Sequence, residues 1–256
     1  MQSETFTTHA RALTGPGGQR VWSLIVSVFG DLAQEKGATI PGPALSKIMA
    51  AMDVRPEATR VALHRLRRDG WITSRKTGRT SLHSLTAHGR SETVAASARI
   101  YASPDSIPRE WQIILAPEDT SETALRAMGY TPLMAGVLIA ARGALVPADA
   151  ALLQGETLPD RLRHAVAPAP LCAEYAALFE TLRRVRSDLP ELIQLPPVQR
   201  AVLRCLIVHN WRRLVLKHSD LPEAVFPQGW RGHECHRLVF DLLQALPRPN
   251  GTDTWS

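Results

Sequence analysis

The chain has 256 residues, of which 45% are hydrophobic and 21% charged, so its composition does not indicate disorder and allows two or three small domains. Its cysteines, Cys172, Cys205 and Cys235, are widely spaced and include no CxxC pair, which argues against a disulfide framework and for free thiols. No secretory signal and no run of about 20 apolar residues is visible, and we therefore expect a cytoplasmic protein without a membrane partner.

The first residues contain helix breakers. Gly15, Pro16, Gly17 and Gly18 follow one another, and we expect residues 1–19 to form a flexible arm.

Three helices are predicted next, at the start of a domain that we place at residues 20–102. An apolar stripe from Val21 to Gly37 predicts the first helix, and PGPALSKIMAAMDV predicts a short second helix that ends before Asp53. Pro56 suits the first position of a third helix, because its missing N–H is not needed there. The predicted buried face of this third helix consists of residues at helical spacing: Thr59, Ala62, Leu63 and Leu66.

The positive charge is concentrated in residues 55–79, RPEATRVALHRLRRDGWITSRKTGR. This segment has eight Lys and Arg residues against Glu57 and Asp69, a surplus equal to the formal net charge of +6 of the whole chain. Within it, Gly70 is predicted to end the third helix. The residues on either side of a Lys76-Thr77-Gly78 turn alternate between apolar and polar, as the strands of a hairpin do.

A focused cationic surface attracts a polyphosphate through counterion release. Three helices, a glycine stop and a basic hairpin follow the order of a winged helix-turn-helix, whose third helix enters the major groove while the hairpin contacts the backbone. The alternative is a solvated basic face without a partner. We favour double-stranded DNA and predict the following contact residues: Arg55, Arg60, His64, Arg67, Arg68, Lys76 and Arg79.

A Pro-punctuated connector, SPDSIP, begins a middle domain at residues 103–165. A strand at 111–115, a helix at 121–128 and a buried strand at 136–141 predict a ferredoxin-like α/β fold. A metal-dependent nucleic-acid-processing enzyme is the alternative function, but only Glu118 and Asp119 would supply carboxylates near the first strand. A third hypothesis is an RNA-binding module, but the predicted middle domain lacks the aromatic-rich strands on which such modules stack bases.

The last third, residues 166–256, is predicted to be a helical domain for effector binding and dimerisation. Polar and aromatic residues cluster toward the later turns of its second helix, beginning with Arg204. Four of them form the candidate effector cluster: His209, Trp211, Arg212 and Arg213. This cluster is either a cationic helix end or the wall of a pocket for an acyl-coenzyme A effector. In the second case Arg212 and Arg213 would meet phosphates and Trp211 would stack on a planar group.

No metal, cofactor or catalytic residue is expected. His233, Cys235 and His236 are neighbours in the sequence, but positions i, i+2 and i+3 of a helix do not converge on one tetrahedral centre. Adjacency on a helix also does not supply the geometry of a catalytic Cys–His pair.

Several motifs resemble those of a known family. VFGDLA, VALHRLRRDGWITSRKTGR and LTAHG are similar to the N-terminal module of the PaaX-type repressors of phenylacetate catabolism. The order of RIYASPDSIPREWQIIL, LRAMGYTPLMAGVLIAAR, HNWRRLVLKHSDLP and WRGHECHRLVFDLLQALP extends the resemblance nearly end to end. The resemblance implies a middle domain similar to a CRISPR-associated nuclease fold, phenylacetyl-coenzyme A as ligand, and phenylacetate operons as targets.

The expected fold class is therefore α+β, mostly α, with an N-terminal winged helix-turn-helix, a ferredoxin-like middle domain and a helical C-terminal domain. The expected function is that of a non-enzymatic repressor released from operator DNA by an aromatic acyl-coenzyme A. We expect a homodimer, because helix-turn-helix proteins commonly read two half-sites with two-fold symmetry.

Overall fold

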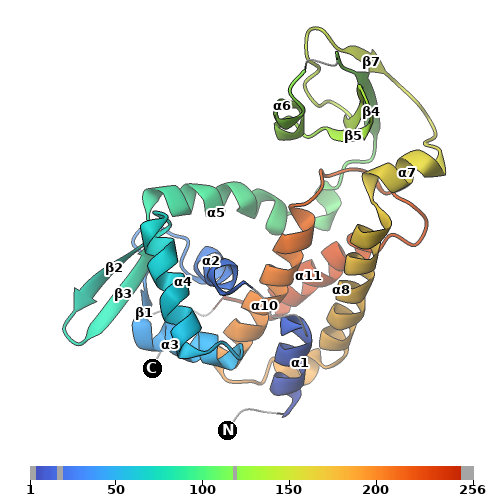
Figure 1. The fold of residues 1–256 in the computed structure, drawn as a ribbon. Coiled ribbons are helices and arrows are strands. Elements are labelled where there is room, and N and C mark those ends of the chain that lie inside the picture. Colours follow the sequence, from blue (N-terminus) through green and yellow to red (C-terminus); the bar gives the residue numbers. More distant parts are fainter. Residues whose placement is uncertain (1–3, 16–19, 118–119, 249–256) are drawn as a thin grey trace. The chain divides into compact units, whose positions relative to one another are not determined.

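The structure, a computed structural model, describes residues 4–15, 20–117 and 120–248. It is an α+β fold made mostly of helices, with two small antiparallel sheets (Figure 1). Contacts divide the chain into two compact units. Residues 1–101, 180–212 and 238–256 form unit 1, and residues 102–179 and 213–237 form unit 2. Every helix within the described ranges is too short or too polar to serve as a membrane span.

Unit 1 begins with a helix where the sequence predicted a flexible arm. Helix α1 (Glu4–Thr14) has Phe6, Ala10 and Leu13 on one face, and these side chains are at most 6% exposed. An isolated helix of 11 residues is marginal in water, and the burial of this apolar face stabilises it. The expectation of an arm is thus corrected for residues 4–14, while residues 1–3 and 16–19 lie outside the described ranges.

Helix α1 is also held by polar contacts. The Thr5 hydroxyl donates a hydrogen bond to Glu191 at 2.6 Å, and His9 Nε2 lies 2.8 Å from Asp188 Oδ2. Both partners belong to the segment around helix α9 (Leu189–Leu192). The contacts join residues about 180 positions apart in the chain, so the local sequence did not reveal them.

The three predicted helices of the N-terminal region are confirmed. They are α2 (Val21–Leu32), α3 (Gly42–Ala51) and α4 (Pro56–Arg68), and α2 ends five residues earlier than expected. The third helix ends at the predicted glycine. The N–H of Gly70 donates to the carbonyl of Arg67, and the N–H of Trp71 donates to that of Leu66, which is the Schellman pattern. Gly70 has φ 73°, a conformation that glycine adopts without strain.

A hairpin follows α4. Strands β2 (Ile72–Thr77) and β3 (Thr80–Leu85) pair antiparallel and leave a two-residue turn at Gly78 and Arg79, so Lys76 lies in the strand rather than in the turn. A two-residue strand, β1 (Ile40–Pro41), pairs with β3 and completes a sheet of order β1-β3-β2. The sequence did not predict β1.

Helix α5 (Ala87–Ile100) begins where the hairpin ends. Thr86 caps it by accepting a hydrogen bond from Gly89 N at 3.0 Å, and the same hydroxyl donates to Gly70 O at 2.6 Å. One side chain therefore fixes the start of α5 to the end of α4.

The helices of the last third contribute to both units. They are α8 (Ala169–Ser187), α10 (Pro197–Val215) and α11 (Gly232–Ala245), and each crosses from one unit to the other. The division by contacts therefore differs from the division expected from the sequence, in which these helices formed a domain of their own.

Unit 2 contains the second sheet. Its strands are β4 (Trp111–Leu115), β5 (Thr131–Met134), β6 (Val137–Ala141) and β7 (Ala151–Leu153), and all neighbours are antiparallel in the order β5-β6-β4-β7. Helix α6 (Glu122–Ala127) connects β4 to β5. The predicted strands at 111–115 and 136–141 and the predicted helix at 121–128 are confirmed, whereas β5 and β7 were missed.

Short elements complete unit 2: the 3-10 helices η1 (Pro104–Ser106) and η2 (Glu223–Val225), and helix α7 (Asp160–Val166). One side of the sheet packs on a core that includes Ile114, Leu125 and Tyr130. Buried Gln112 donates from its amide to the Tyr130 hydroxyl at 2.9 Å and to the carbonyl of Ala144, so this polar side chain is satisfied inside the core.

Candidate nucleic-acid interface

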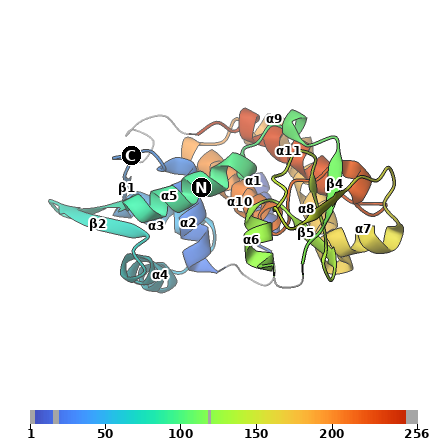
Figure 2. The same ribbon diagram turned by 90° about the horizontal axis from the view of Figure 1, so that it is seen from above.

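The residues that carry the charge surplus are brought together by α4 and the β2–β3 hairpin, which lie beside each other in unit 1 (Figures 1 and 2). All of them are exposed to solvent. We call this set the cationic surface: Arg55, Arg60, Arg65, Arg67, Arg68, Arg75, Lys76 and Arg79.

Helix α4 separates its core side from its charged side. Thr59, Ala62 and Leu66 are at most 6% exposed and face the core, as the helical spacing predicted, whereas Leu63 is only half-buried. On the opposite side, Arg60, His64 and Arg67 occupy positions i, i+4 and i+7 and form one exposed stripe.

The ion pairs on this helix are weak ones. Arg60 lies 2.9 Å from Glu57, but both side chains are more than 70% exposed. Arg65 and Arg68 share Asp69, at 3.4 and 3.1 Å. The hydrogen bond from Arg68 lowers the pKa of the Asp69 carboxyl, so this group stays ionised. Exposed pairs of this kind contribute little, and their arginines are available to a phosphate at small cost.

Arg65 differs from its neighbours. Its guanidinium lies 5.3 Å from the centre of the Trp22 ring on α2, besides its contact with Asp69. A cation over an aromatic face gains roughly 0.5–1 kcal/mol at an exposed site. This arginine therefore braces α4 against α2, and it is not one of the predicted contact residues.

Arg55 occupies the N-cap position of α4. Residues with a side-chain oxygen are preferred at this position, and here no side-chain hydrogen bond caps the helix. The partial positive charge of the helix start and the Arg55 guanidinium thus lie at the same end of α4.

The hairpin carries three cations near its tip. Arg79 lies in the turn, and Arg75 and Lys76 are consecutive residues of β2. Because successive side chains of a strand point to opposite faces, these two place positive charge on both faces of the hairpin.

Arg75 and Val61 are exposed as well, although neither is among the seven predicted contact residues. Arg75 belongs to the basic hairpin that was expected to grip backbone phosphates, beside Lys76 and Arg79. Val61 is 70% exposed between Arg60 and His64, on the outward side of the helix where the helical spacing places it.

His83 supports the hairpin rather than its surface. It is 6% exposed and lies 2.7 Å from the Ser74 hydroxyl through Nδ1. Burial, and to a smaller extent the charge of Arg67, lowers the pKa of this imidazole. The neutral form is therefore favoured beneath the cationic surface.

Two family models match the chain. Residues 20–89 match the family described as PaaX-like protein, and residues 169–253 match the PaaX-like protein C-terminal domain. Together they cover more than half of the sequence. The chain belongs to the PaaX-like protein family.

A curated relative supports this assignment. The PaaX-like chain is 26% identical over 276 residues to the transcriptional repressor PaaX of Escherichia coli (strain K12). The match covers 95% of this chain and 84% of the relative. The first family model covers α2, α3, α4 and the hairpin, so the cationic surface lies within the matched region.

The predicted effector residues of this PaaX-like protein do not share one surface. His209 is fully buried, with Nδ1 2.8 Å from the Ser27 hydroxyl, and the indole N–H of Trp211 donates to the carbonyl of Ile100 at 3.0 Å. Arg212 is half-buried and donates to the Ser23 hydroxyl at 2.7 Å, whereas Arg213 is exposed. Of the four residues of the predicted cluster, Arg213 alone is open to solvent.

The metal and nuclease interpretations gain no support. Among the described residues no group of three or more His, Cys, Asp and Glu side chains is placed to hold a metal ion. Glu118 and Asp119, on which the nuclease alternative depended, lie outside the described residues. His236 instead contacts the carbonyl of Ala102 at 2.8 Å, and burial raises the pKa of the Cys235 thiol.

Proposed function

We propose that this PaaX-like protein is a DNA-binding transcriptional repressor of phenylacetate catabolism, acting as a regulator rather than an enzyme. The observation that carries the proposal is the cationic surface, which holds the whole charge surplus of the chain in exposed positions on one helix and one hairpin. The similarity to a curated transcriptional repressor supports the same function. A repressor of this kind acts in the cytoplasm.

The N-terminal part of unit 1 is proposed to be a winged helix-turn-helix. Helices α2, α3 and α4 and the β2–β3 hairpin follow in the order of that motif, and α4 presents its polar face to solvent. In this proposal α4 enters the major groove. Arg60, His64 and Arg67 face base edges and neighbouring phosphates, and Arg68 contacts the backbone beside them.

Val61 adds an apolar contact to the proposed recognition helix. Its exposed side chain lies on the same solvent-exposed side of α4 as Arg68, where it would meet the methyl group of a thymine in the major groove. The hairpin is the proposed wing. Lys76 and Arg79, with Arg75, would hold it on the phosphate backbone.

The sheet of unit 2 is proposed to be ferredoxin-like. Its strands read 2-3-1-4 in chain order and are all antiparallel, which is the arrangement of a split β-α-β unit with one added strand. Helix α6 supplies the first crossover, while the segment between β6 and β7 contains no helix.

A homodimer is proposed on energetic grounds. One winged helix offers a small set of base contacts, and two copies related by two-fold symmetry would read two half-sites of a palindromic operator. An aromatic acyl-coenzyme A, with phenylacetyl-coenzyme A as the first choice, is proposed to favour a dimer geometry that no longer fits the half-site spacing. Arg213 is the member of the predicted cluster best placed to meet its phosphates, because it is exposed.

Fluorescence anisotropy with labelled promoter DNA tests the proposal. Wild-type protein is expected to bind promoter DNA in preference to random DNA, more weakly as salt rises, and to release it when phenylacetyl-coenzyme A is added. Arg67→Ala should weaken binding by roughly tenfold or more, since a good contact to a base or phosphate contributes about 1–3 kcal/mol. Arg183→Ala is the matched control, because it removes the same charge from an exposed position on α8.

Each outcome is informative. If Arg67→Ala and Arg183→Ala reduce affinity equally, general charge rather than the cationic surface accounts for binding and the assignment of α4 fails. Promoter binding no tighter than binding to random DNA would reject operator recognition at that site. Selective binding that phenylacetyl-coenzyme A does not change would reject the effector and retain the DNA-binding function.

A further inference from the structure

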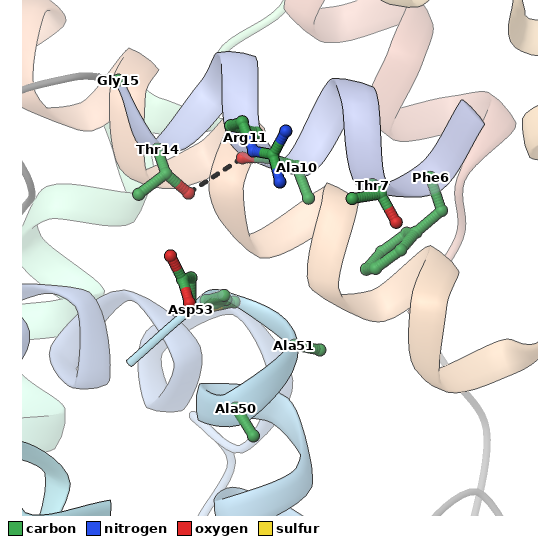
Figure 3. Close-up of a pocket in the computed structure, with 10 residues that line it drawn as sticks. Phe6, Thr7, Ala10, Arg11, Thr14, Gly15, Ala50, Ala51 and Asp53 are labelled. Atoms are coloured by element: carbon green, nitrogen blue, oxygen red, sulfur yellow. Dashed lines mark hydrogen bonds between the residues drawn. The ribbon is translucent and has the colours of Figure 1, made fainter. Parts of the chain in front are cut away.

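A cavity of about 250 Å³ lies in unit 1 between α1 and the end of α3 (Figure 3). Residues of one face of α1 and the four residues from Ala50 to Asp53 line it. Its volume is slightly below the range of about 300–1,000 Å³ that holds drug-sized ligands, and therefore suits a molecule of amino-acid size.

The cavity has an apolar floor and a charged rim. Phe6, Ala10 and Met52 form the floor and are at most 6% exposed. Arg11 and Asp53 are exposed on the rim, and Figure 3 shows them on opposite walls, one on α1 and the other beside the end of α3. Within the described part of the chain, no ion pair engages either of them. As far as the described residues go, the rim thus offers one cation and one anion that no ion pair occupies.

Asp53 has an unusual backbone conformation. It has φ 60° and is the one non-glycine residue with a positive φ among those described. Its N–H donates to the carbonyl of Ala50, and the N–H of Val54 donates to that of Met49, so α3 ends in the same Schellman pattern as α4.

The two helix ends differ in the residue that occupies the strained position. At the end of α4 that residue is Gly70, which adopts a positive φ without cost, whereas at the end of α3 it is Asp53. The positive φ alone does not require a carboxylate side chain at this position. A strained residue whose side chain lies on the rim of a cavity points instead to a role for that side chain.

The electrostatic potential at the cavity is negative on one side and positive on the other. Both α1 and α3 end there, and helix C-termini carry partial negative charge and carbonyls without intrahelical partners. These ends and Asp53 favour a cationic group. Arg11, on the opposite wall, favours a carboxylate, and the floor favours an apolar side chain.

We propose that this cavity is a binding site for a small zwitterion of the α-amino-acid class. The ammonium group pairs with Asp53, the carboxylate pairs with Arg11, and the side chain lies against Phe6, Ala10 and Met52. Binding at this site does not depend on the proposed DNA-binding function. Asp53 precedes Arg55 by two residues, so occupancy would also change DNA affinity, and this last expectation alone rests on that function.

The test uses the full-length protein without DNA. Proteinogenic L-α-amino acids are screened one at a time for an increase in the thermal unfolding midpoint, and those that increase it are titrated by calorimetry. At least one is expected to bind with a Kd below about 1 mM, because two charge-assisted contacts and an apolar floor act together. If L-phenylalanine binds, 3-phenylpropanoate and 2-phenylethylamine, which each lack one charge, are expected to bind about tenfold more weakly.

Substitutions at the rim give a second readout. Asp53→Asn keeps the shape of the side chain, Asp53→Gly removes it, and both residues suit a positive φ, so both variants should fold at least as well as wild type. Each is expected to bind the amino acid about tenfold more weakly, as is Arg11→Ala, while Arg183→Ala should bind it as wild type does.

The proposal is overturned if no amino acid binds, if Asp53→Asn binds as tightly as wild type, or if an analogue with one charge binds as tightly as the zwitterion. Fluorescence anisotropy with promoter DNA on the same preparations tests the proposed DNA-binding function separately from the cavity site. A protein that binds an amino acid but not promoter DNA would support the cavity site and reject the proposed function.

Discussion

The buried ion pair between Asp31 and Arg204 is expected to be the most sensitive polar contact in unit 1. The side chain of Asp31 on α2 is fully buried, and that of Arg204 on α10 is 6% exposed. Arg204 donates through Nε to both carboxylate oxygens, at 3.1 and 2.9 Å, and through Nη2 to one of them at 3.0 Å. Its remaining nitrogen donates to the carbonyls of Leu243 and Leu246 at 2.8 Å.

Asp31 has further partners. The Tyr101 hydroxyl donates to it at 2.8 Å, and Arg248 lies 3.3 Å away. Burial, and then the negative charge of Asp31, raises the pKa of the Tyr101 phenol, so this group keeps the proton that it donates. The carboxylate is thus surrounded by donors, which offsets the cost of removing it from water.

Replacing Asp31 with alanine should therefore destabilise the protein strongly. Two unit charges about 4 Å apart attract each other by about 4 kcal/mol at an effective dielectric constant of about 20. Removing Asp31 leaves the buried charge of Arg204 with its two carbonyl partners but without a buried counter-charge. The expected loss is about 3–5 kcal/mol, a large part of the stability of a typical domain of about 5–15 kcal/mol. Replacing both residues, as in Asp31→Leu with Arg204→Met, should cost less than Asp31→Ala alone, because no buried charge is then left unpaired and the half-exposed Arg248 can be hydrated.

Urea unfolding followed by far-ultraviolet circular dichroism measures this loss. At a denaturant dependence of about 2–3 kcal/mol per M, Asp31→Ala should shift the midpoint down by roughly 1–2 M. Arg183→Ala breaks an exposed ion pair with Glu180 and should cost less than about 1 kcal/mol. The reasoning is refuted if Asp31→Ala is no less stable than Arg183→Ala, or if the double replacement costs more than the single one.

Three further predictions concern the hairpin and its supports. Gly89→Ala would place a Cβ in steric overlap with the backbone oxygen of Trp71 and should cost about 1–3 kcal/mol in the same urea assay. Gly30→Ala meets only ordinary contacts with the Thr93 side chain and should cost far less. Because burial, and then Arg67, lowers the pKa of His83 below 6.5, the unfolded chain binds that proton more readily, and stability should fall as pH drops below about 6.5. His83→Gln removes this contribution, and a variant that keeps the full pH dependence of its unfolding midpoint would contradict the assignment. Lys76→Ala should weaken binding to all DNA sequences alike and reduce the slope of log affinity against log salt by about one, and a change in sequence preference would argue against a pure phosphate contact.

The cationic surface could be predicted because it depends on short-range sequence. Pro56 at the start of α4, Gly70 at its end and the spacing of Thr59, Ala62 and Leu66 together fix which side of one helix faces solvent. Once the solvent-facing side of α4 is known, the exposed positions of its arginines are known as well. No contact with a distant part of the chain is needed to place them.

The elements that were missed are short or depend on distant partners. The strands β1 and β7 have two and three residues, which is too few to show an alternating pattern. Helix α1 did show a helical pattern at Phe6, Ala10 and Leu13, but the glycines and proline that follow it suggested an arm. What stabilises α1 is burial and its contacts with Asp188 and Glu191, which the sequence near α1 does not contain.

The predicted effector cluster shows how the same reasoning fails for a buried helix. Residues 201–209 of α10 are all buried, and a helix that is buried on every side has no solvent face on which a binding cluster can form. Its polar side chains must then find partners inside the protein. Arg204 contacts Asp31, His209 contacts Ser27, Asn210 donates to the carbonyl of Leu13, and Trp211 donates to that of Ile100.

The run of apolar residues in AVLRCLIV, interrupted by one arginine, was the signal that this helix is central. On a central helix a histidine, a tryptophan and an arginine close together indicate internal hydrogen bonds before they indicate a ligand. On α4, where polar residues fill one whole side, the arginines and His64 are exposed, and the ion pairs of Arg60, Arg65 and Arg68 lie on the surface. The difference between the two helices lies in the apolar residues around the charges, and those residues determine whether an arginine stabilises the fold or is available to bind a phosphate.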